Sequence, residues 1–114
     1  MTKEKIVIND HIQGDPLSEE NLDKTLKYLH KIRLLMPEKT IWLYTGYTWE
    51  QIYNCMSFNI MKRRQIISQC DVMIDGRYID SQRNIAAKWK GSNNQRVIDI
   101  QKSLQQSKVV LYCD

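Results

Sequence analysis

The sequence is poor in the residues that build metal centres and disulfide frameworks. It holds three cysteines and two histidines in 114 residues. Cys55, Cys70 and Cys113 are scattered, so no CxxC pair or compact run of metal ligands is present. An odd count without a recognisable secretion signal argues against a disulfide framework. Spacing therefore predicts no metal ligands, and we expect Cys70 and Cys113 to be small buried apolar residues.

Long apolar runs are also absent. No stretch approaches the ~18 apolar residues that span a bilayer, and the first residues lack the apolar core of a signal peptide. The 42% of apolar residues suffices for one core, which predicts a single domain over residues 1–114, soluble and cytoplasmic. The formal net charge of +4 favours solubility or an acidic partner, and nothing indicates specific nucleic-acid binding.

Familiar catalytic motifs are missing as well. The chain contains no Ser-His-Asp arrangement, P-loop or GxGxxG motif. His30 falls on the flank of a predicted helix and is expected to be solvated. His11 precedes a glycine turn, and the sequence leaves open whether its side chain faces a binding site. We therefore assign no catalytic residue from the sequence.

Short β-branched and aromatic runs alternate with amphipathic stretches. Thr48 and Gln51 form a capping-box pattern that opens a helix. Apolar residues on both faces of 40–45 are typical of a strand in a parallel sheet. The alternation predicts an α/β domain with a mainly parallel sheet and flanking helices. We expect strands at 5–8, 40–45, 71–75, 97–100 and 109–112, helices at 18–36, 59–69 (Met61 inside) and 101–107, and a helical turn at 85–89.

Three predicted strands are each followed by a glycine-containing loop. In open α/β sheets, ligands bind beyond the carboxyl ends of the strands, so a site is expected where these loops meet. Asp15 either belongs to an ordinary capped turn or receives an ammonium or hydroxyl group of a small ligand. Asp75 and Arg77 either form a surface pair or bind a ribose hydroxyl or carboxylate.

Four segments occur in an order that resembles a known family. They are GDPL at 14–17, KTIWLYTGYTWE at 39–50, DVMIDGRYI at 71–79 and KGSNNQRVID at 90–99. GDPL alone is weak, but the ordered set is specific. Over about residues 14–104 the chain resembles the anaerobic ribonucleoside-triphosphate reductase activating proteins, which are radical S-adenosylmethionine (SAM) enzymes.

The resemblance implies the carboxyl-terminal part of an incomplete parallel α/β barrel. In that family a [4Fe-4S] cluster on a CxxxCxxC loop reductively cleaves SAM, and the resulting radical forms a glycyl radical on the large reductase subunit. By resemblance, the residues that bind SAM are Gly14, Asp15, Thr45, Gly46, Asp75 and Gly76. The same resemblance makes one loop a candidate for closing the site or contacting the reductase, through Gly91, Asn93, Asn94, Gln95 and Arg96.

The chain also departs from the family pattern. No cysteine precedes Gly14, and Gln13 stands where the family has a glycine. The three scattered cysteines do not replace a CxxxCxxC loop, because cluster thiolates normally come from a tight run. We therefore expect the carboxyl-terminal part of an activase that needs a separate amino-terminal half. The alternatives are a non-catalytic binding module or decoy, and a protein that shares only the fold and binds another small ligand.

Overall fold

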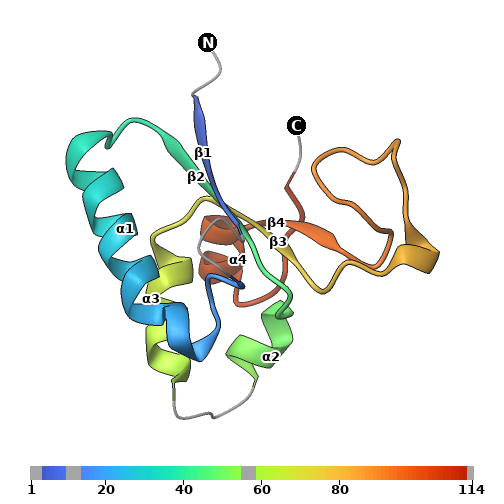
Figure 1. The fold of residues 1–114 in the computed structure, drawn as a ribbon, viewed down its shortest axis with the longest axis horizontal. Coiled ribbons are helices and arrows are strands. Elements are labelled where there is room, and N and C mark those ends of the chain that lie inside the picture. The colour runs from blue at the N-terminus through green and yellow to red at the C-terminus, as the bar shows by residue number, and fades with distance from the viewer. Residues whose placement is uncertain (1–3, 10–13, 55–58, 113–114) are drawn as a thin grey trace.

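The computed structural model describes residues 4–9, 14–54 and 59–112 (Figure 1). Within them no helix is both long enough and apolar enough to cross a membrane. The elements, in chain order, are β1 (Lys5–Ile8), the 3-10 helix η1 (Glu19–Asn21), α1 (Leu22–Leu35), β2 (Thr40–Tyr44), α2 (Trp49–Tyr53), α3 (Ile60–Ser68), β3 (Val72–Asp75), the 3-10 helix η2 (Asp80–Gln82), β4 (Arg96–Asp99) and α4 (Ile100–Gln106).

The strands form one mixed sheet in the order β1-β2-β3-β4. β1, β2 and β3 are parallel, whereas β4 runs antiparallel to β3, so the prediction of a mainly parallel sheet is wrong. The connections explain the difference. α1 separates β1 from β2 and α2 and α3 separate β2 from β3, but only η2 lies between β3 and β4. Without a crossover helix the chain turns back on itself. The expected barrel is not confirmed by this four-stranded sheet.

Helices cover one face of the sheet. Alternating strand residues point into a core shared with α1, α3 and α4. In Figure 1, α1 and α3 stand to the left of the strands. Ile41 and Leu43 of β2, Met73 of β3 and Ile98 of β4 are all completely buried there. The predicted capping box is confirmed: Thr48 and Gln51 exchange side-chain and backbone hydrogen bonds at the start of α2.

The opposite face is covered by aromatic rings instead of helices. Trp42, Val72 and Ile74 form a second buried cluster against which Trp89 and Tyr112 pack. The ring centroids of Trp42 lie 5.2 Å from those of both Trp89 and Tyr112, in edge-to-face geometry. The burial of β2 on both faces, predicted from its sequence, is thereby confirmed.

Several local predictions are wrong. Segment 109–112 makes only an isolated bridge to β4, between Leu111 and Ile98. Residues 85–89 form no helix but only a single turn, in which the Ala87 amide donates to the Asn84 carbonyl at 3.2 Å. Met61 is exposed because its side of α3 faces solvent. The predictions of an exposed His30 and a buried Cys70 are confirmed. His11, Gln13, Cys55 and Cys113 lie outside the described residues.

Candidate functional site

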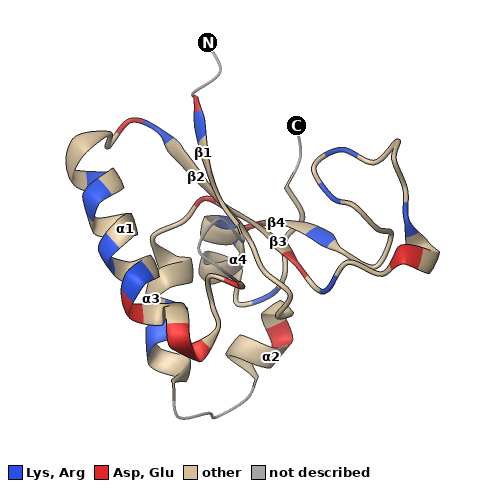
Figure 2. Ribbon diagram, in the orientation of Figure 1, with Lys and Arg blue, Asp and Glu red and all other residues tan. Residues whose placement is uncertain are grey.

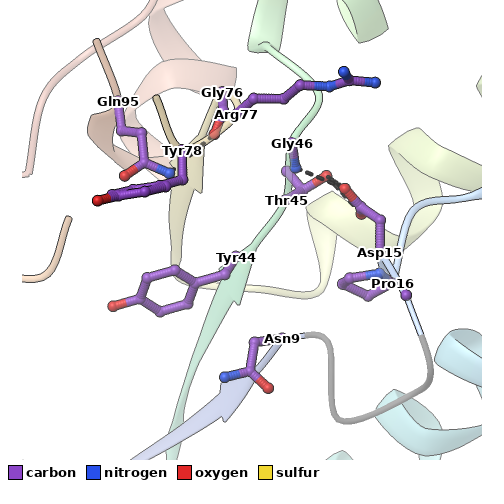
Figure 3. A pocket seen from close by; sticks show the side chains of 11 residues that line it. Asn9, Asp15, Pro16, Tyr44, Thr45, Gly46, Gly76, Arg77, Tyr78 and Gln95 are labelled. Atoms are coloured by element: carbon purple, nitrogen blue, oxygen red, sulfur yellow. Dashed lines mark hydrogen bonds between the residues drawn. The ribbon is translucent and has the colours of Figure 1, made fainter. Parts of the chain in front are cut away.

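The carboxyl ends of β1, β2 and β3 surround a cavity of about 600 Å³ (Figure 3). This volume is in the range of small-molecule sites. Five of the six residues predicted to bind SAM line it, and Asp75 does not. The lining residues are Asn9, Gly14, Asp15, Pro16, Tyr44, Thr45, Gly46, Gly76, Arg77, Tyr78 and Gln95.

Asp15 joins the loop after β1 to the loop after β2. Its Oδ1 accepts hydrogen bonds from the Leu17 amide at 2.9 Å and the Thr45 hydroxyl at 2.8 Å. Its Oδ2 accepts from the Gly46 amide at 2.6 Å. These donors are all neutral, so none of them carries a compensating charge, and together they hold the carboxylate in a fixed orientation at the cavity wall (Figure 3).

The glycines of the site allow the close approach of these loops. A Cβ on Gly46 would lie 3.3 Å from both Asp15 Oδ2 and Arg77 Cγ. Gly76 has φ +89°, a left-handed conformation that side chains rarely adopt. Larger residues at these two positions would push the loops apart or strain the turn after β3.

Asp75 points away from the cavity into a buried ion pair. It is 1% exposed, accepts a hydrogen bond from the Trp49 amide at 3.0 Å, and accepts a second from Arg96 Nε at 3.1 Å. The Arg96 guanidinium also contacts Glu50 at 2.6 Å. Hydrogen bonds to Asp75 and Glu50 raise the pKa of Arg96, and the bond from Arg96 lowers the pKa of Glu50. Asp75 therefore locks β3 to α2 and β4.

The predicted partner-contact loop is fastened to the end of β3. Gln95 Oε1 accepts from the amides of Gly91 and Ser92, while its Nε2 donates to the carbonyl of Gly76 at 3.0 Å. Asn94 Nδ2 donates to the carbonyl of Arg77 at 2.7 Å.

The remaining loop residues also make contacts within the chain. Asn93 accepts a hydrogen bond from Asn84. Gly91 packs against the ring of Tyr78, and a Cβ on Gly91 would lie 3.0 Å from Cδ1 of that ring. Arg96 is engaged in the Asp75 ion pair. The contact with a partner stays a prediction for all five residues.

The sequence analysis missed Asn9, Pro16 and Tyr78 as lining residues. Asn9 directly follows β1, and Tyr78 lies two residues beyond Gly76, so the strand-end rule that found the glycines also covers them.

Arg77 gives the cavity a cation on the same side as Asp15. It also lines a second cavity of about 700 Å³ that shares Asp15, Gly46 and Gly76 with the first. Its guanidinium makes no hydrogen bond with another residue of the described part of the chain. A carboxylate and a guanidinium on one wall fit the two charges of an amino-acid group, and the tyrosine rings offer flat apolar surfaces.

The described residues do not fit an iron–sulfur cluster. No three potential metal ligands gather among them. Cys70 is completely buried beneath the sheet, and burial raises the pKa of its thiol to about 12. Because cluster ligands are thiolates, Cys70 is unsuited to hold iron. Any cluster would need other cysteines.

Comparisons with known proteins agree on one family. The profile described as "4Fe-4S single cluster domain" matches residues 3–98. Anaerobic ribonucleoside-triphosphate reductase-activating proteins are 36% identical over 74% of the chain in Enterobacteria phage T4, 32% over 72% in Vibrio cholerae and 31% over 74% in Escherichia coli K12. These matches cover 47%, 48% and 50% of the relatives, so the chain spans about half their length. No solved structure is significantly similar.

The resemblance found in the four sequence segments is thereby confirmed. The family profile covers residues 3–98, and the named relatives match 72–74% of the chain. The chain belongs to the 4Fe-4S single cluster domain family and is related to the activating proteins of anaerobic ribonucleoside-triphosphate reductase.

Proposed function

We propose that this chain takes part in activating an anaerobic ribonucleoside-triphosphate reductase and binds SAM in the cavity at the carboxyl ends of β1–β3. The relatives are named for that activation. By likeness, the reaction is reductive cleavage of SAM to leave a glycyl radical on the reductase. No step of that chemistry is assigned to the described residues, because they offer no cluster ligands.

One observation carries the proposal. Gly14, Asp15, Thr45, Gly46 and Gly76 come from three loops far apart in the sequence, yet they line one cavity. The described chain supplies a fixed anion, Asp15, for the SAM amino group and a cation, Arg77, for its carboxylate. The rings of Tyr44 and Tyr78 lie across the view from these two side chains (Figure 3) and are suited to the apolar part of a nucleoside.

Titration calorimetry with SAM tests the proposal. We expect one site on the wild-type chain, and an affinity at least about tenfold weaker for Arg77→Ala, since a charge-assisted hydrogen bond contributes about 1.5–3 kcal/mol. Arg83→Ala removes an exposed arginine outside the cavity and serves as the matched control. Absence of SAM binding up to millimolar concentration, or equal weakening by both variants, would contradict SAM binding in this cavity.

A second candidate is a non-catalytic binding module that retains the cavity. The burial and high pKa of Cys70 favour it, because this thiol is withdrawn from metal chemistry. Stoichiometric iron and sulfide bound after anaerobic reconstitution of the purified chain would exclude the module. If no iron binds, electron paramagnetic resonance of the reductase separates the two functions: a glycyl radical that forms only when this chain is added to a cluster-bearing amino-terminal half supports the activase, and no radical supports the module.

A further inference from the structure

Segment 77–95 concentrates the positive charge of the chain. It carries four basic residues and one acidic residue, so its net charge of +3 accounts for most of the +4 of the whole sequence. Figure 1 shows the segment extending sideways from β3 and β4, away from α1 and α3, and Figure 2 shows basic positions distributed along it. The charge is therefore displayed on a projection.

The projection is a fixed structure. The Asn84 amide donates to the Gly91 carbonyl at 3.1 Å, and the Asn93 amide donates to the Gln82 carbonyl at 2.8 Å. These bonds hold its two arms together. Tyr44 donates to the carbonyl of Trp89 at 2.6 Å, which fastens the returning arm to the sheet. A loop ordered in advance loses little conformational entropy when it binds.

The tip of the projection, residues 83–88, presents an apolar side chain between cations. Ile85 is 86% exposed, the highest value among the large apolar residues that the structure describes. Arg83 and Lys88 on either side of it are also exposed. Arg83 forms no ion pair with the described residues. Exposed Lys62 on α3, by contrast, pairs with Asp23 at 3.0 Å.

We propose that residues 83–88 dock onto an acidic protein surface, with Ile85 entering an apolar depression and Arg83 and Lys88 facing carboxylates around it. An apolar anchor surrounded by charges is the usual arrangement of a protein contact. This inference rests on the proposed function, which supplies the partner: the anaerobic reductase. It moves the contact from the predicted residues 91–96 to the tip that those residues support.

A nucleic acid fits this tip less well. Binding to single strands uses exposed aromatic rings as stacking platforms. The aromatic residue nearest the tip, Trp89, is packed against Trp42 and Tyr112. The fully exposed side chain at the centre of the tip is aliphatic.

Binding of the purified chain to the anaerobic reductase of the same organism, measured by biolayer interferometry, tests the inference. We expect Ile85→Asp to weaken binding at least tenfold. Leu34→Asp is the matched control, because Leu34 is 81% exposed on α1, and we expect less than about a twofold change. Arg83→Glu/Lys88→Glu should slow association and flatten its salt dependence, while Lys27→Glu/Lys31→Glu on α1 should not.

The outcomes separate this inference from the function on which it rests. SAM affinity should be the same in wild type and Ile85→Asp, which shows that the cavity is intact. If the wild type binds the reductase and Ile85→Asp binds equally well, the tip is not the docking surface and the proposed function stands. If the wild type binds no reductase, or its tip instead binds a DNA duplex, both the partner and the docking surface are wrong.

Discussion

Two aspartates at strand ends, Asp15 and Asp75, have opposite surroundings. Asp75 is 1% exposed and faces the guanidinium of Arg96. Asp15 is partly exposed at the cavity, and its carboxylate accepts hydrogen bonds only from neutral groups among the described residues. The sequence assigned both to the same site. The structure shows that only one of them keeps an uncompensated charge beside the cavity.

The difference separates a stabilising group from a binding group. A buried carboxylate with a cationic partner stabilises the fold, because losing the cation would leave the carboxylate buried without a counter-charge. A carboxylate fixed by neutral donors still attracts a cation, and its orientation is set before the ligand arrives. A change at Asp75 should therefore lower mainly the free energy of unfolding, whereas a change at Asp15 should lower mainly the affinity for the ligand.

Asp75→Ala should give the largest loss of stability. It leaves the buried Trp49 amide without its acceptor and removes one of the two carboxylates that pair with Arg96, which keeps Glu50, so we expect a loss of about 1–3 kcal/mol. Urea unfolding followed by circular dichroism measures this loss. The double variant Asp75→Ala/Arg96→Met should recover part of it. A loss below about 1 kcal/mol would show that the ion pair does not stabilise the fold.

Asp15→Asn should have its main effect on binding. The amide keeps the shape but removes the charge, so we expect SAM affinity to fall at least tenfold and the unfolding free energy to fall by less than about 2 kcal/mol. Calorimetry and urea unfolding on the same samples give both values. Thr45→Val removes one donor to Asp15 without removing the charge and is the control. Unchanged SAM affinity in Asp15→Asn would refute the binding role.

Tyr44→Phe should loosen the projection formed by segment 77–95. It removes the hydrogen bond to the Trp89 carbonyl, with an expected loss of about 0.5–1.5 kcal/mol. Hydrogen exchange should become faster in segment 77–95 and stay unchanged in α1 and α3. Equal exchange in the segment for wild type and variant would mean that the ring packing around Trp89 is sufficient.

Glu50→Gln should have the smallest effect, and it should depend on pH. The hydrogen bond from Arg96 lowers the pKa of Glu50 in the folded protein. The ionised carboxylate therefore stabilises the fold fully above its ordinary pKa, and this stability is lost as the pH falls from the ordinary pKa through the lowered one. Because the pair is exposed to solvent, we expect less than about 1 kcal/mol at pH 7. Unfolding from pH 7 to 3 should show the variant losing less stability than the wild type; parallel curves would contradict this assignment.

The sequence predicted elements well where the information is local. The Thr48–Gln51 capping box and the apolar run of β2 each depend on residues close together in the sequence, and both predictions were confirmed. The direction of β4 was not predicted, because it depends on the path of segment 77–95 and not on the strand itself. The single bridge at Leu111 shows the same limit, since a β-branched run does not specify how many residues pair.

The sequence located most residues of the candidate site but not the side chains with which they form hydrogen bonds. The strand-end rule located the glycines and Asp15, which follow their strands directly. It failed to separate Asp75 from them, because the partner of Asp75 is Arg96, 21 residues away, and only folding brings the two together. Likewise, the hydrogen bond from the Gln95 amide to the carbonyl of Gly76, 19 residues away, was not predicted, because only folding brings the two together.

The hydrogen bond from the Gly46 amide to Asp15 links residues 31 positions apart, and the cavity has a consequence for the order of folding. Such distant contacts form only after the chain between them has closed, so they appear late. The Gly76 amide donates to the carbonyl of Tyr47, which makes the third loop depend on the second. The cavity is thus completed only when three strands stand side by side, and a ligand held there reports on the finished sheet as a whole.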